Sequence, residues 1–419
     1  MQSVGAVQDE LSISHQRRLQ RLGVLCGLTA GAWLGAAEAP TKLVSVGVSP
    51  IVISLIMVVG VFLARWSLPA SILGTSSVRA DVRRAPHLII WALLAGCIWA
   101  VANTLTIFAI RDIGLSIAFP LWNCNSFLGI LWGFVFFNEL RQAGWRRWTG
   151  VLGGALVMFV GAALLAVASS TQAPAARSMR GVWAALGAGI LWGTMYIPYR
   201  KAYLSGMNPL SFVTFFTFGE LGMMAALAIS YLGLAPLWQE LMTARDVLLW
   251  LMLGGFIWVI GDLFQQYAAK YVGISRGIPL SNTNHLWGLL WGCSYLASCR
   301  GSLLMILGVG AIAFSAARGE EQRQWKEAVR RECERYHLAT DYVQARMLGT
   351  QVADETKPSR GALDWFLVIV AAMILVVFAA IARVPRMSVN GVPVVVLSVA
   401  TLLLLIFSGF TLWRTTRFY

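Results

Sequence analysis

The chain has 419 residues, of which 58% are apolar and only 12% are charged, and its formal net charge at pH 7 is +14. A soluble domain carries about 25% charged residues, so the composition excludes an ordinary soluble protein. Apolar runs long enough to cross a bilayer as helices alternate with short basic clusters. We therefore interpret the surplus of Lys and Arg as loop charges that fix membrane topology, and not as a nucleic-acid surface.

In chain order, we expect a cytoplasmic N-terminus over 1–21 and a first unit of five membrane spans over 22–168. A linker over 169–180 leads to a second unit of five spans over 181–318. Residues 319–361 are rich in charge and are predicted to form a cytoplasmic helical segment. We interpret that segment as a solvated spacer, with regulation or partner binding as the alternative. Two additional transmembrane helices are expected within 362–419.

The ten spans of the two units are expected at about 22–40, 50–67, 87–111, 115–138, 148–168, 181–200, 209–234, 246–270, 274–297 and 301–318. The two units are related by an internal repeat. The stretch 114–133, GLSIAFPLWNCNSFLGILWG, recurs as 273–292, GISRGIPLSNTNHLWGLLWG, with ten identical positions at an offset of 273 − 114 = 159. The same offset pairs Trp99 with Trp258 and Asn103 with Asp262. Such self-similarity indicates a duplicated membrane unit.

The basic clusters indicate the orientation of the spans. They fall on one side of the predicted membrane: Arg17, Arg18, Arg21, Arg65, Arg79, Arg83, Arg84, Arg141, Arg146 and Arg147. The positive-inside rule then places the N-terminus in the cytoplasm, and an even total of spans returns the C-terminus there. Five spans is an odd number, so the second unit is inserted upside down relative to the first. The predicted fold class is an all-α polytopic membrane protein of two inverted five-helix repeats, the layout of secondary transporters.

The repeat predicts a binding site near the middle of the membrane, where transporters of this layout hold their substrate. Aromatic faces and amide groups there suit a small polar solute with apolar CH surfaces, such as a sugar. The candidate substrate-binding residues are Trp99, Asn103, Asn123, Asn125, Trp258, Asp262, Asn282 and Asn284. Pro120 and Pro279 are expected to kink their helices, because each removes a backbone hydrogen bond. Asn123 and Asn125 can face one cavity only if the helix is distorted there; the alternative is that the asparagines join helices by hydrogen bonds.

Three acids lie within the predicted spans, and acids at that depth are usually functional. Asp262, Glu220 and Glu38 each lack an acidic counterpart in the other unit, as expected of a group that couples transport to a proton. We favour Asp262 and then Glu220; the alternative for Glu220 is a protonated acid bonded to a neighbouring Ser or Thr. No paired Asp, Ser/His pair or His/Glu metal cluster at helical spacing is present, so we expect no enzyme, no catalytic residue, no cofactor and no metal.

The repeated residues resemble a known family. The chain is similar to the drug/metabolite transporter superfamily and, within it, to the glucose/ribose porter branch. The resemblance rests on Trp99 to Asn103 with Gly114-Leu-Ser116 and Pro120, and on Trp258 to Asp262 with Gly273-Ile-Ser275 and Pro279. The closing Asn138-Glu139-Leu140 of the fourth span also looks like that family's pattern. The resemblance covers about 22–318.

This resemblance implies a ten-helix fold and uptake of sugars with protons; the alternative is an exporter of drugs or amino acids on the same fold. The expected partners are a small-molecule substrate, protons and membrane lipid, without nucleic acid, and a homodimer is one assembly that we consider. We expect the chain in a bacterial inner membrane.

Overall fold

The computed structural model describes residues 2–42, 48–72, 74–113, 115–140, 144–169, 179–245, 247–284, 287, 307–308, 310–313, 322–340 and 343–344. The secondary structure of this part is helical throughout, which confirms the all-α prediction. Four helical stretches are long and apolar enough to cross a membrane: Pro50–Leu68, Leu88–Ile113, Pro120–Phe137 and Pro209–Leu232. These four helices indicate a membrane protein.

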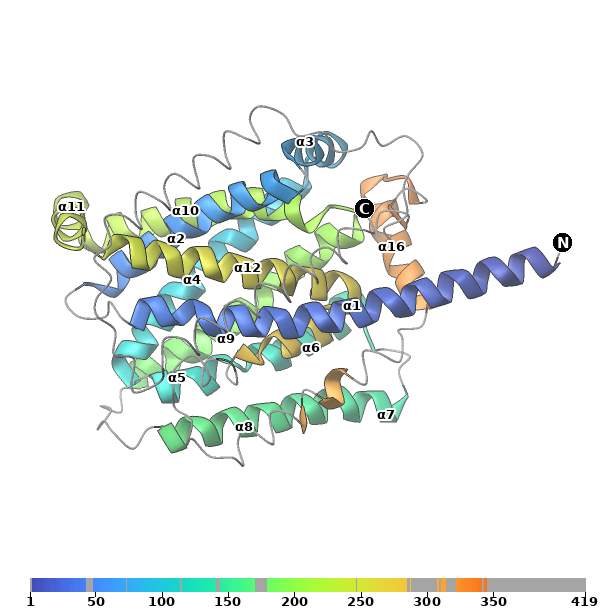
Figure 1. The fold of residues 1–419 in the computed structure, drawn as a ribbon, viewed down its shortest axis with the longest axis horizontal. Coiled ribbons are helices and arrows are strands. Elements are labelled where there is room, and N and C mark those ends of the chain that lie inside the picture. Colours follow the sequence, from blue (N-terminus) through green and yellow to red (C-terminus); the bar gives the residue numbers. More distant parts are fainter. Residues whose placement is uncertain are drawn as a thin grey trace, which may run out of the picture.

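The helices are α1 (Gln2–Lys42), α2 (Pro50–Ile72), α3 (Thr75–Arg84), α4 (Leu88–Ile113), α5 (Leu115–Trp122), α6 (Asn125–Phe137), α7 (Trp145–Trp148), the π-helix η1 (Thr149–Gly153), α8 (Gly154–Ser169), α9 (Met179–Leu204), α10 (Pro209–Leu232), α11 (Leu234–Thr243), α12 (Leu248–Val272), α13 (Ile274–Ser281) and α16 (Gln322–Tyr336). Helix α1 extends back through the predicted N-terminal segment 1–21, and its first turns project beyond the bundle (Figure 1). The expected C-terminal helices within 362–419 lie outside the described residues, as do half of 274–297 and most of 301–318.

The long helices pack side by side in a single bundle. α1 lies along α12, and α9 lies along α4, while α10 contacts both α4 and α2 and α2 contacts α12 (Figure 1). The short helices α3 and α11 run across the direction of the bundle and are seen end-on in Figure 1. This packing brings α2, α10 and α12 together, and these three helices carry the charged cluster described below.

The crossing of α4 and α10 brings two backbones into direct contact. A Cβ added at Gly96 of α4 would overlap the carbonyl oxygen of Phe216 in α10. In return, a Cβ at Gly219 of α10 would overlap the carbonyl oxygen of Leu93 in α4. Only glycine allows such an approach, which is how helices pack closely where lipid removes any hydrophobic drive between them.

The crossing of α2 and α12 has the same construction. Gly60 of α2 faces the carbonyl oxygen of Met252 in α12, and Gly255 of α12 faces that of Met57 in α2, each without room for a Cβ. Both crossings therefore fix the spacing and the register of their helices through the backbone itself.

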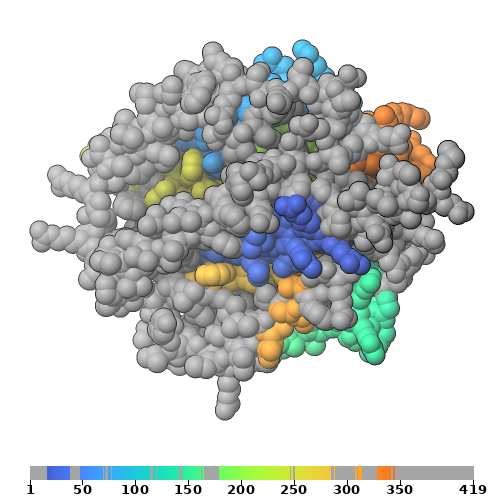
Figure 2. Space-filling view, turned by 45° about the vertical axis from the view of Figure 1, so that its right-hand side comes forward, coloured from blue at the N-terminus to red at the C-terminus, as the bar shows by residue number. Residues whose placement is uncertain are grey.

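The charged segment after 319 includes a helix that packs on the bundle, so our interpretation of it as a solvated spacer was wrong for this helix. Ala328, Val329 and Cys333 of α16 are buried in the main apolar core. Tyr336 stacks on His87, which lies between α3 and α4, with ring centroids 4.1 Å apart. The charged face of α16 remains exposed, and Figure 2 shows it (orange) at the surface. A narrow apolar stripe is enough to attach this helix.

Candidate functional site: a Trp–Asn pocket beside a buried ion cluster

A cavity of about 80 Å³ lies inside the bundle between the two halves of the chain. That space holds several water molecules or one small solute. Its lining residues are Leu34, Trp99, Trp122, Asn123, Asn125, Trp192, Met195, Tyr196, Trp258, Gln265, Asn282 and Asn284. Six of the eight residues that we predicted for substrate binding are in this set. The structure thus brings together, from two distant stretches, the tryptophans and the four asparagines of the repeat.

The asparagines reach one cavity because their helices break beside them. Helix α5, which contains Pro120, ends at Trp122, and α6 begins at Asn125 after a short turn. Within that turn the amide of Asn123 bonds the carbonyl of Pro120, three residues back. After Pro279, helix α13 likewise ends just before Asn282. Each proline is thus followed within three residues by the end of its helix.

Contacts across the cavity join the two halves. The Nδ2 group of Asn282 donates to Asn125 Oδ1 at 2.7 Å and to Ser126 Oγ at 2.6 Å. The indoles of Trp99 and Trp258 meet edge to face, with centroids 4.8 Å apart. Such an arrangement is favourable for aromatic pairs and holds both rings in place. The helix-joining role of asparagine, which we kept as the alternative, is thus present at Asn282 and Asn125 together with cavity lining.

Three lining side chains carry buried polar atoms that have no hydrogen-bond partner among the described residues. They are the acceptor Oδ1 of Asn284 and the indole N–H donors of Trp99 and Trp192. Buried polar atoms normally find a partner, so atoms of this kind in a cavity point to groups that a ligand could satisfy. A hydroxyl both donates and accepts, and so could serve either kind of atom.

The other two predicted binding residues lie outside the pocket lining. Asn103 is buried and donates from Nδ2 to Ser54 Oγ at 2.5 Å. Asp262 belongs to a cluster of charges on the far side of Trp258. Of the predicted coupling residues, Glu38 lies in α1, and its side chain is outside the part that the structure describes.

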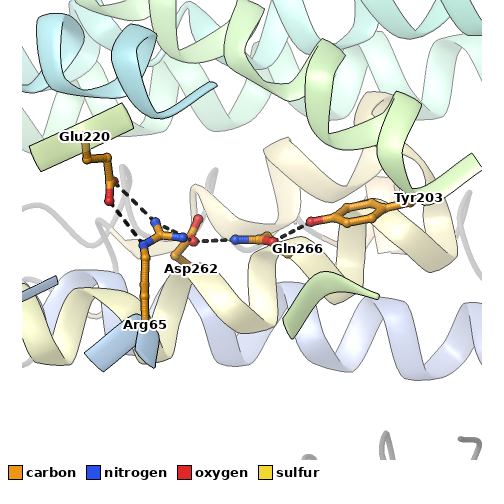
Figure 3. Close-up of polar contacts among 5 residues, drawn as sticks. All are labelled: Arg65, Tyr203, Glu220, Asp262 and Gln266. Carbon is orange, nitrogen blue, oxygen red and sulfur yellow. Dashed lines mark hydrogen bonds and ion pairs between the residues drawn. The ribbon is translucent and has the colours of Figure 1, made fainter. Parts of the chain in front are cut away.

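Arg65 is the centre of that charge cluster, and its position corrects our interpretation of it as a loop charge. Its side chain in α2 is completely buried and lies between two equally buried acids (Figure 3). Arg65 Nε lies 3.3 Å from Glu220 Oε2 in α10, and Nη2 lies 3.0 Å from Asp262 Oδ2 in α12. Glu220 therefore has an arginine partner and not the Ser or Thr that we considered.

Two further residues extend the cluster along α12 and α9. Gln266 donates from Nε2 to Asp262 Oδ2 at 2.6 Å, and Tyr203 donates its hydroxyl proton to Gln266 Oε1 at 2.5 Å (Figure 3). At its other side the guanidinium carbon of Arg65 lies 4.1 Å from the ring centroid of Phe216 and 5.4 Å from that of Trp258. Because Trp258 also lines the pocket, one indole contacts both the cavity and the ion cluster.

A second buried ion pair closes the end of the bundle where α9 ends and α13 begins. Glu139, just after α6, lies 3.0 Å from Nε of Arg200 in α9. The same carboxylate accepts hydrogen bonds from the amides of Ile274 and Ser275 at the first turn of α13. Arg200 in turn donates to the carbonyl of Lys270, near the end of α12. The pair thus joins four elements and stabilises two buried amides at a helix N-terminus.

Sequence reasoning missed Arg65, Tyr196 and Trp192, and it gave no role to Gln266 or Tyr203. One signal was available for Arg65: two acids in apolar spans require a cationic partner, and Arg65 lies inside a predicted span. The others are aromatic or amide residues of a kind that is common in membrane helices. Among the described residues, no group of three or more His, Cys, Asp or Glu side chains could hold a metal ion.

No protein-family model matches the chain, and no curated protein matches it. A solved structure titled only "Crystal structure of protein" is similar to it, with a TM-score of 0.42 and 16% sequence identity over 70% of this chain and 95% of that chain. A likeness at this level carries no conclusion about fold or function.

Proposed function

We propose that the protein is a secondary active transporter that takes up a small neutral polar solute, a sugar in the first instance, together with protons by alternating access. The observation that carries this proposal is the pocket of tryptophans and amides. Aromatic faces pack on CH surfaces, and amides and indole N–H groups bond hydroxyls. None of the described lining residues carries a formal charge, which favours a neutral solute over an anionic or cationic one.

The helix crossings support the layout of two inverted five-helix repeats. Adding 159 to Met57, Gly60, Leu93 and Gly96 gives Phe216, Gly219, Met252 and Gly255. These eight residues form the two backbone crossings, so the contact of Gly96 with Phe216 corresponds to that of Gly255 with Met57. Corresponding residues in the two halves therefore make corresponding contacts. Alternating access in inverted repeats consists of one unit rocking against the other around a fixed site.

The ion cluster supports proton coupling. Arg65 binds two carboxylates, and the group is sealed from water yet contacts the pocket through Trp258. Titratable groups buried at membrane depth are a recurrent feature of proton-coupled carriers. A solute that moves Trp258 would therefore change the surroundings of Arg65. In the other direction, a proton on either acid would change the contacts of Arg65 with Trp258, and so the shape of the pocket.

The test is uptake by the purified full-length protein in proteoliposomes, with a labelled panel of hexoses, pentoses, an amino acid and a cationic dye. We expect an inward proton gradient to stimulate the uptake of a sugar. Movement of the dye or the amino acid without any sugar would favour the alternative, an exporter on the same fold. Absence of all movement, with the protein folded and inserted, would contradict the proposal.

Two tryptophans of α9 provide a matched pair of variants. Trp192 lines the pocket, whereas Trp183 is 66% exposed on the same helix. Trp192→Ala should weaken binding of the transported sugar, and Trp183→Ala should leave it unchanged. Asn125→Ala and Asn284→Ala each remove an amide, and each should weaken the binding free energy of the sugar by about 1 kcal/mol, or roughly fivefold in affinity. Equal affinities in all four variants would remove this pocket from the transport pathway.

A further inference from the structure

We propose that Glu220, and not Asp262, is the carboxylate that takes up and releases the coupling proton, and that Tyr203 and Gln266 hold Asp262 ionised as the permanent partner of Arg65. This assignment rests on the proposed function and specifies which residue binds the coupling proton. The sequence had favoured Asp262 over Glu220 for this role, and the assignment reverses that order.

The charge of the cluster fixes the number of protons. With all three side chains ionised, one guanidinium faces two carboxylates, which leaves a net charge of −1 among side chains that are 0% exposed. An uncompensated charge buried away from water is strongly unfavourable. One proton bound to either carboxylate removes this net charge. A second proton, on the other carboxylate, would leave the guanidinium without an ionised partner. The cluster is therefore built to exchange a single proton.

The two acids are not equally suited to carry that proton. Asp262 Oδ2 receives two donors at short distance, Arg65 at 3.0 Å and Gln266 at 2.6 Å. Among the described residues, Glu220 is bound only by the guanidinium, at 3.3 Å and 3.4 Å, which is longer than a typical charge-assisted hydrogen bond. Donors stabilise the charged form of a carboxylate, so the ionised state is better supported at Asp262. The proton accordingly belongs on Glu220.

Tyr203 fixes the direction of the hydrogen-bond chain. An ionised carboxylate can only accept, so Gln266 must present its NH₂ group to Asp262 and its oxygen to Tyr203. The hydroxyl of Tyr203 then has to donate, as observed. Without that donor, the amide of Gln266 could turn over and present its oxygen to a protonated Asp262. Tyr203 is thus a positioning residue that acts on Asp262 through Gln266.

In the part of the chain that the structure describes, the other elements around α10 add no competing charge near Glu220. Helix α9 contributes the phenol of Tyr199 beside Arg65, and α4 contributes the thiol of Cys97, which contacts the carbonyl of Gly219. Asp81 of α3 and Glu240 of α11 bind the backbone amides of Asn208 and Ser49. Those two acids lie near opposite ends of α10, away from its middle, where Glu220 is situated.

Protonation of Glu220 has a structural consequence. It removes the ionic contact between α2 and α10 and leaves Arg65 paired with α12 alone. The guanidinium of Arg65 lies against the ring of Trp258, which lines the pocket. A change in the partners of Arg65 therefore changes how that ring is held. When Glu220 releases its proton again, its contact with Arg65 forms again.

Infrared difference spectroscopy of the reconstituted full-length protein tests the assignment without any substrate. A protonated carboxyl group gives a carbonyl-stretch band that disappears as it ionises with rising pH. Two preparations are compared, one with ¹³C-carboxyl-labelled glutamate and one with ¹³C-carboxyl-labelled aspartate. We expect the titrating band to shift only with labelled glutamate, to vanish in Glu220→Gln and to persist in Glu139→Gln, a control at another buried glutamate. A shift with labelled aspartate, or no titrating band, would overturn the assignment.

Two variants test the charge count and the positioning chain. Asp262→Asn should also abolish the band, because Arg65 and Glu220 then form a neutral pair; a persisting band would contradict the single-proton balance. In Tyr203→Phe, part of the band should become sensitive to the aspartate label, and a band unchanged by that substitution would refute the role of Tyr203. The uptake assay is scored separately: a glutamate band without proton-stimulated uptake refutes the transporter, whereas proton-stimulated uptake with an aspartate band refutes only this assignment.

Discussion

Replacement of Arg65 by methionine would test the ion cluster most directly. Methionine keeps most of the length of the side chain and its contact with the ring of Phe216, but it removes the guanidinium that lies between Glu220 and Asp262. Two carboxylates would then remain buried without a cation. Removal of one partner from a buried ion pair typically costs about 3–5 kcal/mol, and we expect Arg65→Met to lower the free energy of unfolding by that amount.

The same reasoning predicts a rescue. When all three charges are replaced together, in Arg65→Met with Glu220→Gln and Asp262→Asn, no charge is left in this cluster. Neutral replacements of buried ion clusters are often as stable as the original, so the triple variant should lie within about 2 kcal/mol of the wild type. The three substitutions would then be strongly non-additive, as expected of side chains in direct contact.

The assay is equilibrium unfolding in mixed micelles of a mild detergent and SDS, followed by tryptophan fluorescence. Arg65→Lys serves as a control that keeps the charge but loses the second donor group, and it should fall between the wild type and Arg65→Met. The reasoning would be refuted if Arg65→Met unfolded within 1 kcal/mol of the wild type. It would also be refuted if the triple variant were no more stable than Arg65→Met.

The remaining predictions concern the crossings, the attached helix and the second ion pair. Gly255→Leu should destabilise the bundle by at least about 1–3 kcal/mol, because a Cβ there meets the carbonyl of Met57. A Cβ at Gly222 meets nothing within 4 Å, so Gly222→Leu should be close to neutral, and equal SDS midpoints for the two variants would contradict the crossing. Desolvation by burial lowers the pKa of His87, so its neutral form is favoured when α16 is attached. Attachment should be complete above about pH 6.5 and weaken as the pH falls from there through the lowered pKa. Amide exchange of α16 at pH 7.5 and pH 5 measures this, and His87→Phe should abolish the difference. Glu139→Gln should cost about 1–3 kcal/mol in the same unfolding assay by weakening the contacts with Arg200 and the first turn of α13, and an unchanged midpoint would contradict a stabilising role for the pair.

The pocket could be predicted from the sequence because its residues repeat. Identical spacing in two stretches singled out Asn123, Asn125, Asn282 and Asn284 against an apolar background, and the prolines beside them predicted the broken helices. Asn103 shares this repeat with Asp262, yet neither lines the cavity. The offset identifies corresponding positions, but which face of a helix meets the cavity depends on packing that the sequence does not specify.

Arg65 could not be placed in the same way. An arginine near the end of an apolar run has the same local pattern whether it extends to the membrane surface or turns inward to a partner. Its partner Glu220 is 155 residues away in the chain. Helix α16 was misread for a related reason: its many charges dominate the composition, while Ala328, Val329 and Cys333 form a stripe only one or two residues wide.

The two glycine crossings have a consequence for how the molecule can move. Each joins a helix of one half to a helix of the other, α4 to α10 and α2 to α12, through atoms of the backbone that cannot change rotamer. Contacts between side chains can slide or repack, but at these two crossings the helices can only turn about the point of contact or separate. The crossings would therefore be pivots for any relative motion of the two halves. Any swing of one half against the other would be smallest beside them and largest at the ends of the bundle, where Glu139 and Arg200 are paired and α16 is attached.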